Sequence, residues 1–122
     1  MLDFVNSLPD GLNTWIGEAG RRLSGGEIRR VAVARAILHN APVWVMDEPT
    51  EGLDAITERS LMQALRELTA GRTFLMVTHR LIDLYWMNHI VMLERGRVIA
   101  QGSHQHLLKT NRRYVALHAR IG

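Results

Sequence analysis

The sequence contains no cysteine, and its only lysine is Lys109. The lack of cysteine excludes a disulfide framework and a cysteine-ligated zinc site, and it fits a reducing compartment. No apolar run approaches the roughly 18 to 20 residues that would span a bilayer. Asp3 and Asn6 interrupt the first residues, which also lack the basic start of a signal peptide. If the protein works at a membrane, we expect another segment or another chain to cross it.

Composition and charge indicate what class of protein this is and which partners it has. The chain has 122 residues, of which 47% are hydrophobic, so we expect one globular domain or part of one. The net charge of +3 is carried almost wholly by arginine. A net positive charge can indicate binding to nucleic acid or to an anionic membrane surface. Because the arginines are scattered among acidic residues, we interpret them as a solvated surface and predict no nucleic-acid partner.

Helical and extended patterns alternate along the chain. Wholly or largely apolar short runs are typical of strands in a parallel sheet that is covered on both faces. Strands are predicted at residues 43–46, 73–78, 90–93 and 98–101, and helices at 26–39, 55–70, 81–86 and after Ser103. The first long helix is predicted to bury Ile28, Val31, Ala34 and Leu38, and the second to begin at an Asp54 cap. This order indicates an α/β layered fold.

A turn of small residues opens the first long helix. Residues 23–27 have the sequence Leu-Ser-Gly-Gly-Glu. Free amides and the helix dipole at such a terminus attract anions, and glycines let a phosphate approach the backbone closely. The Ser24 hydroxyl adds a donor. Taken alone, such a turn is more often an ordinary helix cap.

Polar residues follow both predicted parallel strands. Asp47 and Glu48 come after four apolar residues, and His79 follows the next strand. The carboxyl edge of a parallel sheet is where α/β proteins bind ligands. Asp47 could hold Mg²⁺, Glu48 could orient or deprotonate a water, and His79 could donate to a phosphate. The alternatives are a solvated acidic loop and a packed histidine. The pair at His104 and His106 has no partner cluster, so we predict no histidine metal site there.

Together these patterns resemble the ATP-binding cassette (ABC) family. Residues 23–27 match its signature motif, 43–48 match Walker B with the catalytic glutamate, 52–54 match the D-loop, and His79 matches the switch histidine. The resemblance covers the whole chain but only the C-terminal half of a family domain. The Walker A pattern G-x-x-x-x-G-K-[ST] does not occur, and the Q-loop has no counterpart. We expect residues 1–39 to be the end of the helical subdomain and 40–122 to run from Walker B to the C-terminus.

The resemblance implies the fold, the cofactors and the site. The fold would be the C-terminal half of a P-loop NTPase-like domain, and the ligands would be ATP and Mg²⁺. Two cassettes would join head to tail, so that the signature of one covers the nucleotide of the other. The nucleotide-binding residues implied are Ser24, Gly25, Gly26, Glu27 and Asp54; the metal residue is Asp47; the catalytic residues are Glu48 and His79.

Further segments are similar to those of exporter cassettes. Residues 14–20 resemble the segment that contacts the membrane domains, and 78–81 and 101–104 also fit exporters. Residues 51–55 depart from the commoner exporter pattern and are similar to the CydC-type subunit of heterodimeric thiol exporters needed for cytochrome bd assembly. The implied function is ATP-driven export of glutathione or cysteine, performed at the cytoplasmic face of the inner membrane with transmembrane domains and a second subunit.

Two hypotheses about the chain itself stay open. In the first, it is part of an exporter's ATPase subunit and is inactive alone. In the second, it is a short, non-hydrolysing interaction module that lends its signature face to a complete cassette. An in-frame upstream stretch encoding Walker A and membrane helices supports the first hypothesis, whereas a separate promoter and start site supports the second.

Overall fold

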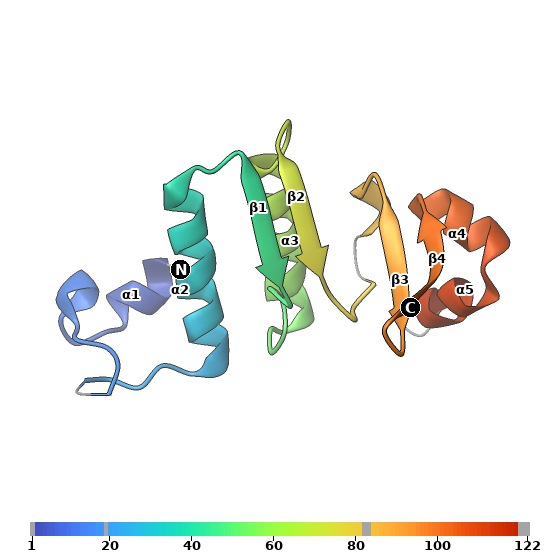
Figure 1. Ribbon diagram of the computed structural model, residues 1–122. Coiled ribbons are helices and arrows are strands. Elements are labelled where there is room, and N and C mark those ends of the chain that lie inside the picture. The colour runs from blue at the N-terminus through green and yellow to red at the C-terminus, as the bar shows by residue number, and fades with distance from the viewer. Residues whose placement is uncertain (1, 19, 82–83, 120–122) are drawn as a thin grey trace.

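Helices and strands alternate as the sequence predicts (Figure 1). The computed structural model describes residues 2–18, 20–81 and 84–119. The helices are α1 (Leu2–Asn6), α2 (Gly25–His39), α3 (Ala55–Leu68), α4 (His104–Thr110) and α5 (Arg112–Ala119), with 3-10 turns η1 (Gly11–Asn13) and η2 (Leu84–Trp86). The strands are β1 (Val43–Asp47), β2 (Thr73–Val77), β3 (Ile90–Glu94) and β4 (Arg97–Gly102). Of the short helix predicted at 81–86, residues 82 and 83 lie outside the described part of the chain.

The strands β1 and β2 form the parallel sheet that the apolar runs predict. Their register pairs Val43 with Thr73 and Asp47 with Val77, so both strands end at the same level. The backbone amide of Glu48 continues the ladder by donating to the Val77 carbonyl at 2.8 Å. The residues that follow the two strands are therefore neighbours at the carboxyl edge of the sheet.

One face of this sheet carries the main hydrophobic core. Trp44 and Met46 of β1 are buried together with Met62 and Leu65 of α3, which lies behind the strands in Figure 1. Phe74 of β2 completes this layer, and the ring of Trp86 stacks on it at a centroid distance of 5.7 Å.

The opposite face of the sheet is open, contrary to the prediction that both faces are covered. The outward side chains of Val43, Val45, Leu75 and Val77 are each more than half exposed. Among the described residues, α3 and one side of α2 share the core on the first face, and no element covers the second face of these strands.

The helix α2 begins where the sequence predicts, but its buried face is different. Ser24 caps it, and Asn40 ends it in a left-handed conformation with φ of 49°. Of its residues only Val33 is buried, whereas Ile28 and Leu38 are 55% and 84% exposed. Apolar residues occupy several sides of this helix, and the described chain covers only the side that carries Val33. Val31 and Ala34 of the predicted inner face are half-buried, whereas the prediction is wrong for Ile28 and Leu38.

The C-terminal part forms a separate layer of a hairpin and two helices. Strands β3 and β4 pair antiparallel, and both turn residues, Arg95 and Gly96, have positive φ, as a two-residue type I′ turn requires. Ser103 caps α4 by accepting from the His106 amide, as predicted. A break at Asn111 divides the last helical region into α4 and α5, and Tyr114 of α5 is fully buried.

Candidate functional site

The sheet register brings Glu48 and His79 into direct contact. Nδ1 of His79 lies 2.8 Å from Oε1 of Glu48, and the His79 backbone amide donates to the same oxygen at 3.1 Å. An ionised carboxylate can only accept, so Nδ1 carries the proton and Nε2 stays available on the other side of the ring. The His79 side chain is 70% exposed, which leaves Nε2 free to meet a ligand.

The backbone at Glu48 is held in an unusual conformation. Its φ of 46° places a non-glycine residue in the left-handed region, which costs on the order of 1–3 kcal/mol. The amide bond to Val77 and the two contacts to His79 hold the residue there. The second carboxylate oxygen, Oε2, is buried and has no hydrogen-bond partner among the described residues. Strain and an unpaired buried acceptor together are typical of a residue placed for a ligand.

The environment of Glu48 favours its charged form. Burial acts to raise the pKa of this carboxyl group, but the hydrogen bonds and charge of His79, with a smaller contribution from Thr78, outweigh it and lower the pKa below its ordinary value. The group is therefore ionised at neutral pH, and it can accept a hydrogen bond or a proton at Oε2.

Asp47 is the last residue of β1, and its side chain is exposed beside Glu48 in the sequence. It takes part in no ion pair or side-chain hydrogen bond with the rest of the described chain. Mg²⁺ in nucleotide sites is commonly held by one or two carboxylates together with phosphates and water, and a free carboxylate at this edge fits that donor set. Among the described residues, no group of three or more histidine, cysteine or carboxylate side chains could form a metal site by themselves.

The predicted signature residues open α2 with a complete capping box. The Ser24 hydroxyl accepts from the Glu27 amide at 3.2 Å, and the Glu27 carboxylate accepts from the Ser24 amide at 2.7 Å. Gly25 and Gly26 form the first turn, so their amides point out of the helix end. Glu27 therefore serves the helix end in this structure, and the Ser24 hydroxyl retains its donor hydrogen.

Asp54 caps α3, and the loop of residues 52–54 that contains it lies next to the signature turn. Its Oδ1 accepts from the Ile56 and Thr57 amides at 3.1 and 3.0 Å, and its Oδ2 accepts from the Thr57 hydroxyl at 2.6 Å. The Thr57 hydrogen bonds lower the pKa of Asp54. A Cβ atom added at Gly26 would lie 3.8 Å from Leu53, so the signature turn and the 52–54 loop are adjacent.

Two further ion pairs connect these segments, and the sequence analysis did not identify them. Arg29 of α2 reaches Glu51, and Arg80 beside His79 reaches Glu58 of α3. The departure at residue 51 from the commoner exporter pattern was a signal for the first pair. Nothing in the spacing of residues 58 and 80 indicates the second.

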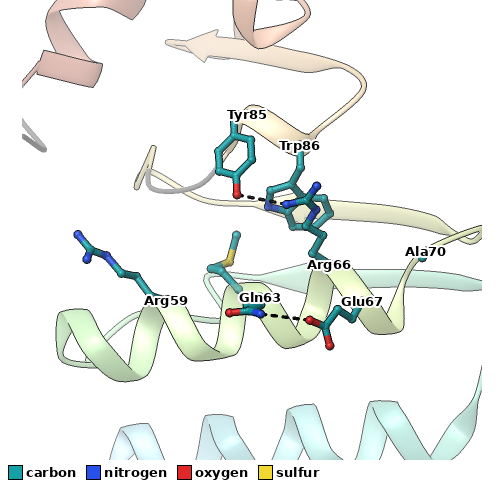
Figure 2. A pocket seen from close by; sticks show the side chains of 8 residues that line it. Arg59, Gln63, Arg66, Glu67, Ala70, Tyr85 and Trp86 are labelled. Carbon is teal, nitrogen blue, oxygen red and sulfur yellow. Dashed lines mark hydrogen bonds between the residues drawn. The ribbon is translucent and has the colours of Figure 1, made fainter.

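A pocket between α3 and η2 lies away from all these residues. It has a volume of about 620 Å³ between α3 and η2, and none of the predicted site residues lines it (Figure 2). The Arg66 guanidinium lies 5.5 Å from the centre of the Tyr85 ring and donates to its hydroxyl at 3.3 Å, while Gln63 bonds Glu67 on the same helix. This pocket is therefore separate from the site at the sheet edge.

Known proteins resemble this chain over nearly its whole length. The ABC transporter family profile matches residues 4–51. The CydC protein of a glutathione/L-cysteine transport system, from Escherichia coli K12, is 53% identical over 85% of this chain. An ATP-dependent lipid A-core flippase from Thiobacillus denitrificans is 50% identical over 96% of it. The chain spans 18% and 20% of the lengths of these two relatives.

The fold also matches a solved exporter. A bacterial Atm1-family ABC exporter with ATP bound superposes with a TM-score of 0.86 and 39% identity, covering 97% of this chain and 21% of that one. In the described residues, no helix combines the length and the apolar character needed to cross a membrane. The order of motifs, the sheet-edge geometry and these similarities agree: the chain belongs to the ATP-binding domains of ABC transporters.

Proposed function

We propose that the chain is the C-terminal half of the ATPase domain of an ABC exporter, with residues 1–39 ending the helical subdomain and 40–122 carrying the hydrolytic residues. The observation that supports this most directly is the contact between Glu48 and His79, at 2.8 Å, at the carboxyl edge of two parallel strands. Glu48 has one oxygen fixed by His79 and one buried oxygen unpaired. A carboxylate held in this way suits the activation of a water molecule.

In the proposed reaction Glu48 activates the attacking water, and His79 contacts the terminal phosphate. Oε2 of Glu48 accepts a hydrogen bond from the attacking water, orients it and takes its proton. His79 keeps Glu48 in place through Nδ1, and its exposed Nε2 faces the terminal phosphate. In the protonated imidazole Nε2 donates a hydrogen bond to that phosphate, which stabilises charge as the bond to the leaving group breaks.

Asp47 and the signature turn serve the nucleotide in two different ways. Mg²⁺ bound with ATP would neutralise phosphate charge, and the exposed Asp47 carboxylate would hold it, directly or through water. The amides of Gly25 and Gly26 and the Ser24 hydroxyl would meet the ATP held by a second subunit, joined head to tail. Asp54 orders the start of α3 next to that interface.

The proposed partners are a second ABC subunit and the transmembrane domains of the exporter, with the chain at the cytoplasmic face of the inner membrane. The segment 14–20, of which residue 19 is not described, would contact the membrane domains. Its Trp15 is 72% exposed, and an aromatic side chain left in water is suited to docking. The proposed cargo is a thiol, glutathione or cysteine, because CydC and a CydD protein from Bacillus subtilis are 53% and 46% identical to the chain.

The experiment uses the full-length protein that contains this chain, reconstituted in liposomes with its partner subunit. We expect Mg-ATP hydrolysis and ATP-dependent uptake of labelled glutathione or cysteine into inside-out vesicles. Stimulation by lipid A-core lipids without thiol uptake would assign the protein to the flippases, which are equally similar. The absence of hydrolysis by the purified pair would contradict the proposed ATPase function itself.

A further inference from the structure

An ion pair with one buried end adjoins the Glu48–His79 contact in the chain, because Arg80 follows His79 directly. Nη2 of Arg80 lies 2.6 Å from Oε2 of Glu58, whose side chain is 1% exposed, whereas the Arg80 side chain is 30% exposed. Glu58 is in the first turn of α3, and its amide donates to the Asp54 carbonyl at 2.9 Å. The pair therefore joins the residue next to His79 with the helix that Asp54 caps.

The loop of residues 78–80 has few other attachments. The Arg80 amide donates to the Thr78 hydroxyl at 3.0 Å, which closes a tight turn around His79. His79 itself is attached only through Glu48 among the interactions of the described residues, and its ring is largely exposed. A buried charged hydrogen bond one residue away is the strongest anchor this turn has, because burial protects it from competition with water.

We propose that Glu58 and Arg80 are positioning residues that fix the 78–80 turn on α3 and so hold His79 against Glu48. This proposal rests on the proposed ATPase function, since it assigns a role within that site. Without the pair, the 78–80 turn still forms but is no longer fixed on α3, and His79 loses its fixed distance to the Glu48 carboxylate. The defect appears in the hydrolysis step rather than in nucleotide binding.

The same pair could instead only stabilise the fold, and the two roles respond differently to substitution. Removing one partner leaves a buried charge unpaired and destabilises the protein. Replacing both partners by apolar side chains of similar volume commonly restores stability. The double replacement does not restore an anchor for the turn. Stability and hydrolysis therefore separate in the double variant if the pair is a positioning device.

The test compares Glu58→Gln, Arg80→Lys and the double variant Glu58→Met/Arg80→Met in the full-length exporter. Each is assayed for kcat, for the KM of ATP and for its melting temperature, at a temperature well below each variant's own melting point. We expect kcat to fall about tenfold or more in all three, with the KM of ATP within about twofold of the parent. Recovery of parental kcat in the double variant, or unchanged kcat in the single variants, overturns the proposal.

Two controls make the result specific. Glu67→Gln makes the same chemical change on the same helix, at an exposed residue whose one side-chain hydrogen bond among the described residues is accepted from Gln63 (Figure 2), and kcat should not change. Glu48→Gln should abolish hydrolysis when the partner subunit's own catalytic carboxylate is disabled. If the parent does not hydrolyse ATP, the proposed function fails; if it does and Glu67→Gln lowers kcat as much as Glu58→Gln, the positioning role fails.

Discussion

The Arg29 guanidinium donates hydrogen bonds to both the side chain and the backbone of Glu51. Its Nη2 lies 2.7 Å from the Glu51 carboxylate, and its Nη1 donates to the Glu51 carbonyl at 3.0 Å. The guanidinium also lies over Gly52, whose φ of 77° favours glycine, and a Cβ atom there would be 3.5 Å from Nη1. The signature helix and the loop before Asp54 are thereby joined. The signature turn is proposed to serve the ATP held by the second subunit, and Glu51 follows the proposed catalytic Glu48 by three residues, so Arg29 is placed to link the two sites.

This link predicts coupled effects of substitutions at residues 29 and 51. In the full-length exporter, Arg29→Gln and Glu51→Ser should each lower ATPase activity by about two- to fivefold. The double variant should be no worse than either single variant, because both remove the same contact. Both side chains are partly exposed, at 35% and 49%, so the melting temperature should change little, as for a pair worth about 1 kcal/mol or less.

The measurement is steady-state hydrolysis of Mg-ATP. Arg113→Gln, which breaks the exposed pair of Arg113 with Glu94 outside the site, is the matched control and should leave the rate unchanged. Multiplicative losses in the double variant would show that the two residues act independently, contrary to the prediction.

The contacts that follow from local rules were predictable from the sequence. Caps at Ser24, Asp54 and Ser103 depend on short polar side chains at helix starts, and the meeting of Glu48 with His79 follows because parallel strands end at one edge. The strands and long helices lie within a few residues of their predicted bounds.

Contacts that depend on packing were not predictable. The pair of Arg80 with Glu58 joins residues 22 apart, and it depends on how α3 crosses the sheet. The buried face of α2 was predicted wrongly because the helix has apolar residues on several sides, and periodicity cannot tell which side finds a partner. The open sheet face carries the same apolar side chains as a covered one, so the pattern could not reveal that no described element packs on it.

Ser24 allows its capping role and its proposed phosphate-binding role to be separated. Ser24→Ala should destabilise the protein by about 1 kcal/mol, since the cap is lost. Ser24→Asp keeps a strong cap and should preserve the melting temperature. Its carboxylate would repel the phosphates of the partner subunit's ATP, so we expect ATPase activity to fall about tenfold or more while the mutated subunit still binds nucleotide.

Ser103 provides the matched control for this experiment, because it caps α4 by the same contact to the third residue of the helix. Ser103→Asp should preserve both stability and hydrolysis. Parental ATPase activity in Ser24→Asp, measured in the assembled pair, would refute a role for the signature serine at the nucleotide.

The C-terminal layer should loosen at acidic pH through His104. Its Nδ1 lies 2.8 Å from the buried Tyr114 hydroxyl, and burial, together with the nearby charge of His118, lowers the pKa of His104 below its ordinary value of about 6.5. Between the folded pKa and that ordinary value the unfolded chain binds more protons. Stability from this group is therefore complete above about pH 6.5 and is lost as pH falls through the folded pKa.

Hydrogen exchange in peptides covering α4 and α5 measures this effect between pH 7.5 and pH 5, after correction for the intrinsic rate. Protection should fall with pH in the parent protein. His104→Asn, whose Oδ1 can still accept from Tyr114, should weaken that dependence, whereas His106→Asn at an exposed site of the same helix should not. A pH dependence unaltered by His104→Asn would assign the effect to another group.

Glu48→Gln tests the proposed chemistry of the site. Glutamine keeps the size of the side chain and an oxygen that accepts from the His79 amide, but it cannot take a proton from water. Loss of a general base lowers rates by about 10² to 10⁴. Asp47 is unchanged, so ATP and Mg²⁺ should remain bound, and the closed dimer should persist on ATP.

In a heterodimer the second site can conceal this loss, so the measurement is single-turnover hydrolysis with the partner's own catalytic carboxylate disabled. The control is Glu67→Gln in the same background, which carries the same substitution at the surface of α3. We expect the Glu48→Gln protein to bind ATP with parental affinity and to release almost no phosphate. If it hydrolyses ATP as fast as an active parent, the water is activated by another group, and the fixed pair of Glu48 and His79 holds the sheet edge together without taking a proton.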